Sequence, residues 1–407
     1  MITIERKEDC CGCSACMAAC PVDAIQMTAD DEGFRYPQID MEKCINCGKC
    51  DRVCPIKNPV PEIPKEQKAY LFQLKDKKLR MDSTSGGAFT AIASTILREG
   101  GVVFGAAYDE KLQVIHTYVE KEADLWRFRN SKYVQSNVQN SFRQVKDFLQ
   151  QVRKVCFSGT PCQVEGLNSY LKNVDKKQNL ILVDLVCRAV PSPLLWKKYV
   201  AWQQKRLGKE IGNIRFRDKR HYGYKYSQMV IEDKAGNVIY HSGVESDPYL
   251  RAFFSNLSDR PSCYECKFKK RYRVSDMTIW DCFDVGLKDK DFDDDLGTTN
   301  ILIHNKKKEK VIRENSQGSV RKITPDECVA GMRELVSFVD VNNSRDEFFD
   351  VVKIKNMNDI CQEWFPDSGY VKVKRVFRII LLKTGMYSFV KKMLMRNRLE
   401  KARKEKR

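Results

Sequence analysis

The sequence lacks any uninterrupted apolar run of the ~18 residues that a membrane-spanning helix requires. It also lacks an apolar segment ahead of its first cysteine, because residues 1–6 lead almost directly to Cys10. We therefore expect neither a signal peptide nor a transmembrane anchor, and we expect a cytoplasmic protein. The 407 residues are 42% hydrophobic and 31% charged, which is ordinary for a globular chain of two or three domains.

Positive charge is concentrated at one end of the chain. The net charge is +18, and residues 371–407 contain eight Lys and six Arg against two Glu. Phe377, Ile380, Phe389 and Met393 recur there at roughly helical spacing, and Gly385 is expected to break the helix. Three interpretations remain open: a helix packed on the body, attachment to the inner face of an anionic membrane, or docking on a protein or polyanion. A nucleic-acid partner is not expected.

Cysteine is abundant, with 17 residues, and eight of them form two copies of the spacing C-x2-C-x2-C-x3-C-P. This run is typical of two-cluster bacterial ferredoxins, in which the fourth cysteine of each run ligates the cluster of the other run. Zinc sites and disulfide frameworks have different spacings. The predicted ligand sets are Cys10, Cys13, Cys16 and Cys54 for one [4Fe–4S] cluster, and Cys44, Cys47, Cys50 and Cys20 for the second. The protein is therefore expected to transfer electrons.

The remaining sequence predicts an α+β protein, in which the small two-cluster domain precedes a larger mixed α/β domain. Strands are expected at 70–74, 102–106, 114–119, 155–158 and 180–186, helices at 88–99, 138–150, 161–171 and 193–203, and a hairpin at 229–240. The expected division is a ferredoxin domain at 1–58, a proline-rich linker at 59–66, the α/β domain at 67–370 and the basic amphipathic tail at 371–407.

Several short strings occur in one order behind the cysteine runs. They include Ser85-Gly86-Gly87-Ala88-Phe89-Thr90, Ser131-Lys132-Tyr133-Val134-Gln135-Ser136, Ser158-Gly159-Thr160-Pro161-Cys162-Gln163, Phe216-Arg217-Asp218-Lys219, Arg260-Pro261-Ser262-Cys263-Tyr264-Glu265-Cys266 and Ser275-Asp276-Met277-Thr278-Ile279. Together they resemble the family of the beta subunit of coenzyme F420 hydrogenase and dehydrogenase. More specifically, the chain resembles bacterial members with an N-terminal two-cluster ferredoxin domain. The resemblance covers roughly residues 1–290.

The resemblance implies an iron–sulfur flavoprotein oxidoreductase. Members bind FAD and often a further [4Fe–4S] cluster, and they pass electrons between clusters, flavin and an organic substrate. The implied substrate is coenzyme F420 or a similar molecule, or an intermediate of surface-polysaccharide biosynthesis, since many bacterial members lie among such genes. An electron donor or acceptor protein is the implied partner. The alternative is a non-catalytic electron-transfer subunit that serves a partner enzyme.

Three segments are candidates for binding the flavin, and a fourth is a candidate for binding its substrate. Ser85, Gly86 and Gly87 precede a helix whose amides suit a pyrophosphate, and Gly159, Thr160 and Pro161 connect a strand to a helix. Ser131 and Lys132 form the third segment, with the Lys132 charge beside the flavin or simply in solvent. Lys132 and Arg217 are the candidate catalytic residues. The segment Arg217, Asp218 and Lys219 either lines the substrate pocket or forms an exposed strand end.

A third metal site is expected from Cys162, Cys187, Cys263 and Cys266. A [4Fe–4S] cluster, a zinc ion and unligated thiols remain alternatives for this set. Cys11 is expected to play no part. The chain departs from the family strings at Asp281-Cys282-Phe283-Asp284 and at Arg188 after Cys187. The resemblance therefore implies no single substrate for this chain.

Overall fold

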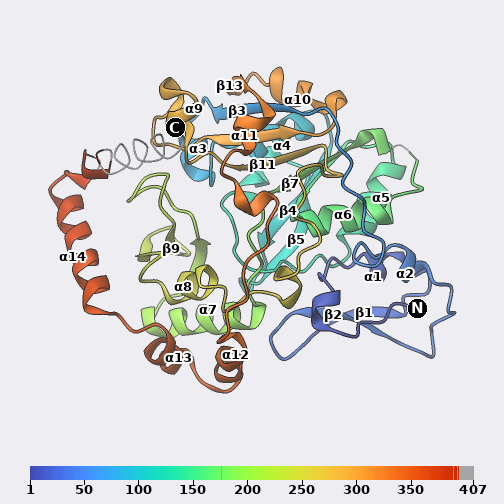
Figure 1. Cartoon of the computed structure of the whole chain (residues 1–407), viewed down its shortest axis with the longest axis horizontal. Helices are drawn as coiled ribbons and strands as arrows, with labels where there is room; N and C mark the ends of the chain where they lie inside the picture. The colour runs from blue at the N-terminus through green and yellow to red at the C-terminus, as the bar shows by residue number, and fades with distance from the viewer. Residues whose placement is uncertain (176, 388, 392, 394–407) are drawn as a thin grey trace.

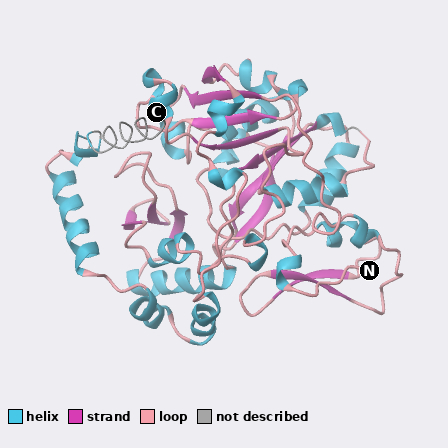
Figure 2. Ribbon diagram, in the orientation of Figure 1, coloured by secondary structure: helices cyan, strands magenta, loops and turns pink. Residues whose placement is uncertain are grey.

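The computed structural model describes residues 1–175, 177–387, 389–391 and 393. It has a small N-terminal domain, a larger α/β body, and a C-terminal helix, α14 (Gly369–Lys383), on the side of the body away from the N-terminus (Figure 1). Figure 2 shows most strands of the body gathered in one large sheet with helices around it. This is the fold class expected from the sequence.

The N-terminal domain has few regular elements, because its tight cysteine loops occupy much of the chain. They are α1 (Ala15–Ala19), β1 (Ile25–Ala29), β2 (Arg35–Ile39) and α2 (Lys49–Arg52). The strands β1 and β2 form an antiparallel hairpin. Gly12 and Gly48, one in each cysteine run, both have φ +68, a left-handed conformation that glycine adopts without strain. A side chain at Gly12 would also lie 2.8 Å from Gln135 Nε2 of the body.

The body is built on an eight-stranded mixed sheet with the order β13-β3-β12-β11-β7-β6-β4-β5. The strands are β3 (Lys68–Leu74), β4 (Val102–Tyr108), β5 (Val114–Val119), β6 (Val155–Gly159), β7 (Leu180–Leu185), β11 (Met277–Asp281), β12 (Thr299–Ile303) and β13 (Gly318–Ile323). The four central strands β4, β6, β7 and β11 run parallel, and the outer pairs are antiparallel. Parallel pairing brings the carboxyl ends of β6 and β7 to the same edge of the sheet.

Alternating apolar residues of this sheet build a core on each face. On β4, Val103 and Ala107 pack with the helix α4 (Ala88–Arg98). Val102 and Phe104 point the other way, toward α5 (Ser141–Gln150) and α6 (Pro161–Tyr170). This two-residue period is what a strand covered on both sides requires.

A second, three-stranded sheet packs with the longer helices into another core. Its strands are β8 (Ile211–Arg215), β9 (Gln228–Asp233) and β10 (Val238–Gly243), and its helices are α7 (Pro193–Leu207), α8 (Pro248–Phe254), α12 (Arg345–Ile354) and α13 (Met357–Trp364). The other helices are α3 (Lys77–Asp82), α9 (Val285–Lys288), α10 (Lys310–Arg313), α11 (Pro325–Val329) and α14 (Gly369–Lys383). No helix in the described part of the chain is both long and apolar enough to cross a membrane.

The strands, helices and hairpin expected between residues 70 and 240 all occur, with ends shifted by a few residues. The helix expected to start near 138 begins at Ser141, and the strand expected to end at 186 ends at Leu185. α14 ends at Lys383, two residues before Gly385. The part of the basic tail at 394–407 lies outside the described residues, as do 388 and 392.

Buried polar contacts fix the N-terminal domain to the body. Arg260 is fully buried and donates hydrogen bonds to the carbonyls of Cys10 (2.8 Å) and Arg35 (3.0 Å) and to the Gln135 side chain (2.8 Å). Its guanidinium lies 4.3 Å from the centre of the Tyr36 ring. The cluster domain is therefore a fixed part of the molecule.

A buried ion pair makes a second contact between the two domains. Arg345 of α12 binds the carboxylate of Glu32, at 3.2 Å for one of its nitrogens, and both side chains are buried. Arg345 also donates to the Asp259 carbonyl. Removing one partner of such a pair leaves an uncompensated buried charge, which costs about 3–5 kcal/mol.

We therefore expect Arg345→Met to lower the free energy of unfolding by about 3–5 kcal/mol. The matched control is Arg333→Met, because Arg333 pairs with Asp340 in solvent, where both side chains are largely exposed. The control should change stability by less than about 1 kcal/mol. Anaerobic urea unfolding of both variants measures the difference, and equal losses would contradict a buried, interdomain role for Arg345.

Candidate functional site

The eight cysteines of the N-terminal domain surround two separate cavities. Cys10, Cys13, Cys16 and Cys54 line one cavity, together with apolar residues such as Ile2, Ile4 and Met27. Cys20, Cys44, Cys47 and Cys50 line the other, with Val22, Ile25 and Ile45 among their neighbours. Each cavity thus takes three cysteines from one run and the fourth from the other run, the grouping that the spacing predicts.

Backbone amides point at three of these sulfur atoms. The amides of Gly12, Ala24 and Ile2 donate to Cys10 Sγ (3.4 Å), Cys20 Sγ (3.2 Å) and Cys50 Sγ (3.3 Å). Such hydrogen bonds stabilise thiolates and tune the potential of a cluster that they ligate. Four thiols, apolar walls and amide donors are a donor set that fits an iron–sulfur cluster.

Four more thiols meet at the edge of the large sheet. Cys162 lies in the first turn of α6 after β6, and Cys187 follows the parallel neighbour β7. Cys263 ends the short 3-10 helix Pro261–Cys263, and Cys266 follows it. Burial, with further contributions from the thiols of Cys162 and Cys266, raises the pKa of Cys187 to about 12. Burial and the thiols of Cys187 and Cys266 likewise raise the pKa of Cys263.

The thiols of this set repel one another when they are ionised, and nearby cations oppose that repulsion. The Lys269 ammonium lowers the pKa of Cys187, and it donates to the carbonyls of Cys187 and Arg188. Arg273 acts in the same direction on Cys187 and Cys266. Four half-buried thiols with adjacent cations suit a cluster that carries negative charge. In the part of the chain that the structure describes, no three His, Cys, Asp or Glu side chains converge closely enough to hold a single metal ion.

Cys11, which we expected to play no part, connects the first cysteine cavity to this third set. Its buried thiol interacts with the thiols of Cys13 and Cys162, and the interaction with Cys13 together with burial holds its pKa well above the usual value. Cys13 lines the first cavity and Cys162 belongs to the third set. A continuous row of sulfur atoms therefore crosses from the N-terminal domain into the body.

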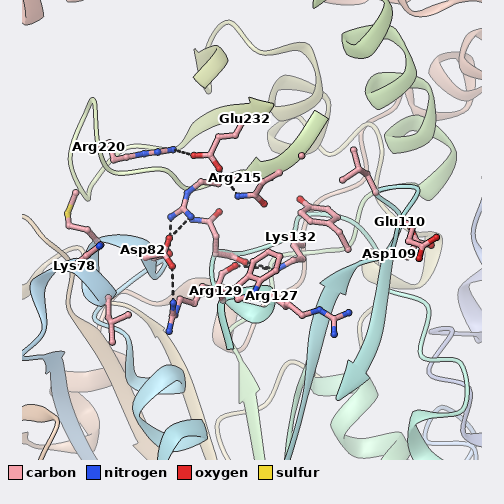
Figure 3. A pocket seen from close by; sticks show the side chains of 18 residues that line it. Lys78, Asp82, Asp109, Glu110, Arg127, Arg129, Lys132, Arg215, Arg220 and Glu232 are labelled. Atoms are coloured by element: carbon pink, nitrogen blue, oxygen red, sulfur yellow. Dashed lines mark hydrogen bonds and ion pairs between the residues drawn. The ribbon is translucent and has the colours of Figure 1, made fainter. Parts of the chain in front are cut away.

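A pocket of about 630 Å³ opens in the body beside α3 and the segment 126–132 (Figure 3). Cavities of about 300–1,000 Å³ are typical of ligand sites. Its charged lining residues are Lys78, Arg127, Arg129, Lys132, Arg215 and Arg220 against Asp82, Asp109, Glu110 and Glu232. Cations thus outnumber anions by six to four, which favours an anionic ligand.

Ion pairs hold several of these cations in place. Asp82 binds Arg215 (2.6 Å) and Arg129 (3.2 Å), and Glu232 binds Arg220 (2.8 Å), as Figure 3 shows. Among the described residues, the buried Nε of Arg129 has no hydrogen-bond partner. An unpaired buried donor at a pocket wall is a natural contact for a ligand phosphate.

Lys132 lies half-buried in the wall of this pocket, and not free in solvent. Its ammonium donates to the carbonyls of Arg129 and Asn130, both at 3.3 Å, and lies 5.4 Å from the centre of the Tyr108 ring. Burial, followed by repulsion from Arg215, lowers the pKa of Lys132 to about 7. An anion bound here would restore the charged form.

The Ser85–Gly87 loop lies beside this segment, although most of its polar groups are already used. Thr84 Oγ1 accepts from the Ser131 amide (2.7 Å) and lies 3.1 Å from Ser131 Oγ, which joins the two segments. The Gly86 amide donates to Thr299 Oγ1 (2.9 Å), and a side chain at Gly86 would collide with the Phe72 carbonyl. Gly87, however, caps α4 without a side-chain oxygen, so the first-turn amides of α4 have no side-chain cap.

Arg217 and Lys219 are buried and neither lines the pocket. Arg217 pairs with Asp281 (3.0 Å), bonds Tyr133 Oη (3.3 Å) and lies over the Phe283 ring. Lys219 donates to the carbonyls of Ser85 (2.9 Å), Leu296 (2.7 Å) and Arg80 (2.6 Å). The structure therefore gives Lys219 a role in positioning the loop that contains Ser85. No sequence pattern indicates this role, because the three carbonyls are far from Lys219 along the chain.

The predicted flavin segment Gly159–Pro161 lies elsewhere. Gly159, Thr160 and Pro161 stand at the start of α6, where the Thr160 hydroxyl lies 3.1 Å from Cys162 Sγ and the Gln163 side chain completes a capping box. The structure thus separates these residues from the pocket and places them at the third thiol set. Tyr133 connects the two places, because it follows Lys132 and packs with Cys263 against the cluster of Ala189, Phe253, Tyr264 and Val339.

Comparisons with known proteins match both halves of this arrangement. Residues 152–327 match the family model described as the C terminus of the coenzyme F420 hydrogenase/dehydrogenase beta subunit. Residues 9–58 match the model of a 4Fe-4S dicluster domain. The first matched segment contains the third thiol set, and the second contains the eight cysteines of the two runs.

Two relatives found by sequence match only short parts of the chain, whereas one solved structure matches a larger share. Ferredoxin 7Fe of Hydrogenibacillus schlegelii is 37% identical over 73 residues, which are 17% of this chain and 87% of that ferredoxin. A component of the Na(+)-translocating ferredoxin:NAD(+) oxidoreductase complex of Acetobacterium woodii is 46% identical over 55 residues, 13% of this chain and 15% of that protein. A chain of the F420-reducing [NiFe] hydrogenase complex from Methanosarcina barkeri matches with a TM-score of 0.44 at 16% identity, covering 75% of this chain and 95% of that one.

The crossed grouping of cysteines can be tested with one substitution in each run. Cys20→Ser should damage the cluster held with Cys44, Cys47 and Cys50, because Cys20 lines that cavity. Cys54→Ser is the matched control and should damage the cluster held with Cys10, Cys13 and Cys16. Paramagnetic resonance spectra of the reduced variants distinguish the two signals. Loss of the same signal in both variants would contradict the crossed grouping.

Proposed function

Because the chain belongs to the family of coenzyme F420 hydrogenase and dehydrogenase beta subunits, whose C-terminal domain it carries behind a 4Fe-4S dicluster domain, we propose that it is an iron–sulfur flavoprotein oxidoreductase. The observation that carries the proposal is the row of thiols through Cys11, which joins the first cysteine cavity to the third thiol set. The proposed electron path runs from the cysteine cavities through this row to the cationic pocket, whose Lys132 precedes Tyr133, a residue that packs against the same apolar cluster as Cys263.

Electrons would enter or leave this path at the second cysteine cavity. Cys47 is exposed there, and Ile45 and Met41 leave more than half of their side-chain surface in solvent. An exposed ligand within an apolar patch suits a transient electron-transfer partner, whose contacts are small. In this proposal the partner is an electron donor or acceptor protein that docks beside Cys47.

The opposite end of the path is the pocket, which would hold FAD. When bound there, FAD couples the single electrons of the clusters to two-electron chemistry on an organic substrate. The uncapped amides of α4 and the free Nε of Arg129 would bind its phosphates. Lys132 would place a positive charge beside the ring, and Lys219 would hold the Ser85 loop in position.

In this proposal, the residues predicted from the sequence to bind the flavin serve two different cofactors. Ser85, Gly86, Gly87, Ser131 and Lys132 stay with the flavin. Gly159, Thr160 and Pro161 instead support the thiol of Cys162, and with it a third [4Fe–4S] cluster. The substrate would be an anionic molecule such as coenzyme F420 or a glycan-pathway intermediate. The Arg217–Asp281 pair lies outside the pocket lining, where Arg217 bonds the hydroxyl of Tyr133.

The direct test is the cofactor content of the anaerobically purified chain. We expect about twelve irons with twelve sulfides and one FAD per chain, from three [4Fe–4S] clusters. Cys263→Ser should lower the iron content to about eight and leave the FAD content unchanged. About eight irons and no flavin in the unmodified chain would overturn the proposal in favour of a non-catalytic electron-transfer subunit.

The charge state of Lys132 makes flavin binding dependent on pH. The free lysine has a pKa of about 7, and an anionic ligand favours its charged form, so binding takes up a proton above pH 7. Affinity for FAD should therefore fall as pH rises, by up to about tenfold per unit above pH 7.

Two variants isolate that effect. Lys132→Met should bind FAD more weakly and lose the dependence on pH between 7 and 9. Lys78→Met removes an exposed lysine from the same pocket and should keep the dependence. Fluorescence titration of the apoprotein with FAD measures both, and an unchanged pH profile in Lys132→Met would refute the assignment.

A further inference from the structure

Most apolar residues of the helix α14 face away from the body, and Leu381 is its one buried residue. Five of its apolar residues, at the spacing of one helical face, are between 52% and 71% exposed. These residues, which we call the outer stripe, are Tyr370, Val373, Val376, Phe377 and Ile380. A helix packed on a protein surface normally shows the opposite arrangement, with its apolar face buried.

The inner face of α14 is held to the body mainly by arginine side chains. Arg375 binds Asp367 at 2.8 Å and Ser246 at 3.3 Å. Arg378 binds Glu245 and the hydroxyl of Tyr226. These contacts fix the rotation of the helix, so the outer stripe is held outward by its neighbours. Figure 1 shows α14 along the outer edge of the molecule, on the side away from the N-terminus.

Exposed lysines border the outer stripe. Lys372, Lys374 and Lys383 are all exposed, and among the described residues none of them has an ion-pair partner. The sequence contains no Asp or Glu between residues 368 and 399. An apolar stripe with lysines along its sides matches the interface of an anionic bilayer, where the stripe enters the acyl boundary and the ammonium groups contact headgroups.

We propose that α14 is an interfacial helix that binds the chain to the surface of an anionic lipid membrane. The uniform charge favours a lipid over a second copy of this chain, because two such helices would repel each other. Arg378 of α14 contacts Tyr222 and Tyr226. Tyr224, which lies between these two tyrosines in the chain, contacts Ser85. A membrane bound to α14 would therefore lie close to the Ser85 loop beside the pocket. The helix needs no cofactor for this binding, so its test is independent of the redox proposal.

The test is flotation of the full chain with vesicles of phosphatidylcholine, alone or mixed with phosphatidylglycerol. We expect binding to the mixed vesicles and at least tenfold weaker binding to phosphatidylcholine alone. The variant Val373→Ser, Phe377→Ser, Ile380→Ser should bind at least a hundredfold more weakly, because it removes most of the outer stripe. The variant Lys372→Gln, Lys374→Gln, Lys383→Gln should lose roughly fivefold per lysine on the mixed vesicles only.

A matched control removes three exposed apolar residues elsewhere. Val336→Ser, Val341→Ser, Ile354→Ser changes side chains that are 54%, 59% and 81% exposed, and it should bind as the unmodified chain does. Iron content and visible absorption report that each variant is folded. Equal binding to both vesicle types would overturn the proposal, as would an equal loss in the control. Dimerisation through α14 in solution, with no vesicle binding, would overturn it in favour of contact between copies.

Discussion

The arrangement of redox sites depends on one buried cation, Arg260. Its guanidinium holds the carbonyl of Cys10 from the first cysteine run and the Gln135 side chain from the body, and it stacks on Tyr36. Only glycine fits at position 12, because any side chain would meet this guanidinium. A charge buried so deeply must be satisfied by several partners, so the contact has one geometry. Cys263, which belongs to the third thiol set, follows Arg260 by three residues.

That geometry explains how the sulfur atoms line up across two domains. Because the first cysteine loop is fixed against the body, Cys11 lies beside Cys162. Gly166 of α6 is so close to this loop that a side chain at position 166 would lie 2.8 Å from Cys13 Sγ. Lys269 and Arg273 then compensate the charge of the third thiol set, as Arg260 does beside Cys10. Cations thus lie beside Cys10 and beside the third thiol set, and a nearby cation is a condition that stabilises a thiolate out of water.

Local spacing made the two cysteine cavities and the central strands predictable. Cluster ligation and strand periodicity both act over a few residues, and the parallel order of β6 and β7 put Cys162 and Cys187 at one sheet edge. Other features depend on contacts between distant residues. Gly86 is used by the sheet through Thr299, Lys219 supports Ser85, and Gly159–Pro161 serve a thiol and not the pocket. The outward face of α14 follows from its arginine contacts, which periodicity alone does not reveal.

The central claim is that electrons cross from the N-terminal domain to the pocket through the third thiol set. Rapid mixing of the oxidised holoprotein with a one-electron reductant, with flavin bleaching and cluster absorption recorded together, tests it directly. The comparison is between the unmodified chain and Cys266→Ser, which removes one thiol of that set while leaving the pocket intact. If electrons take this route, the clusters of the variant are reduced at the normal rate, while its flavin is reduced at least a hundredfold more slowly. Flavin reduction at the same rate in both proteins would contradict it.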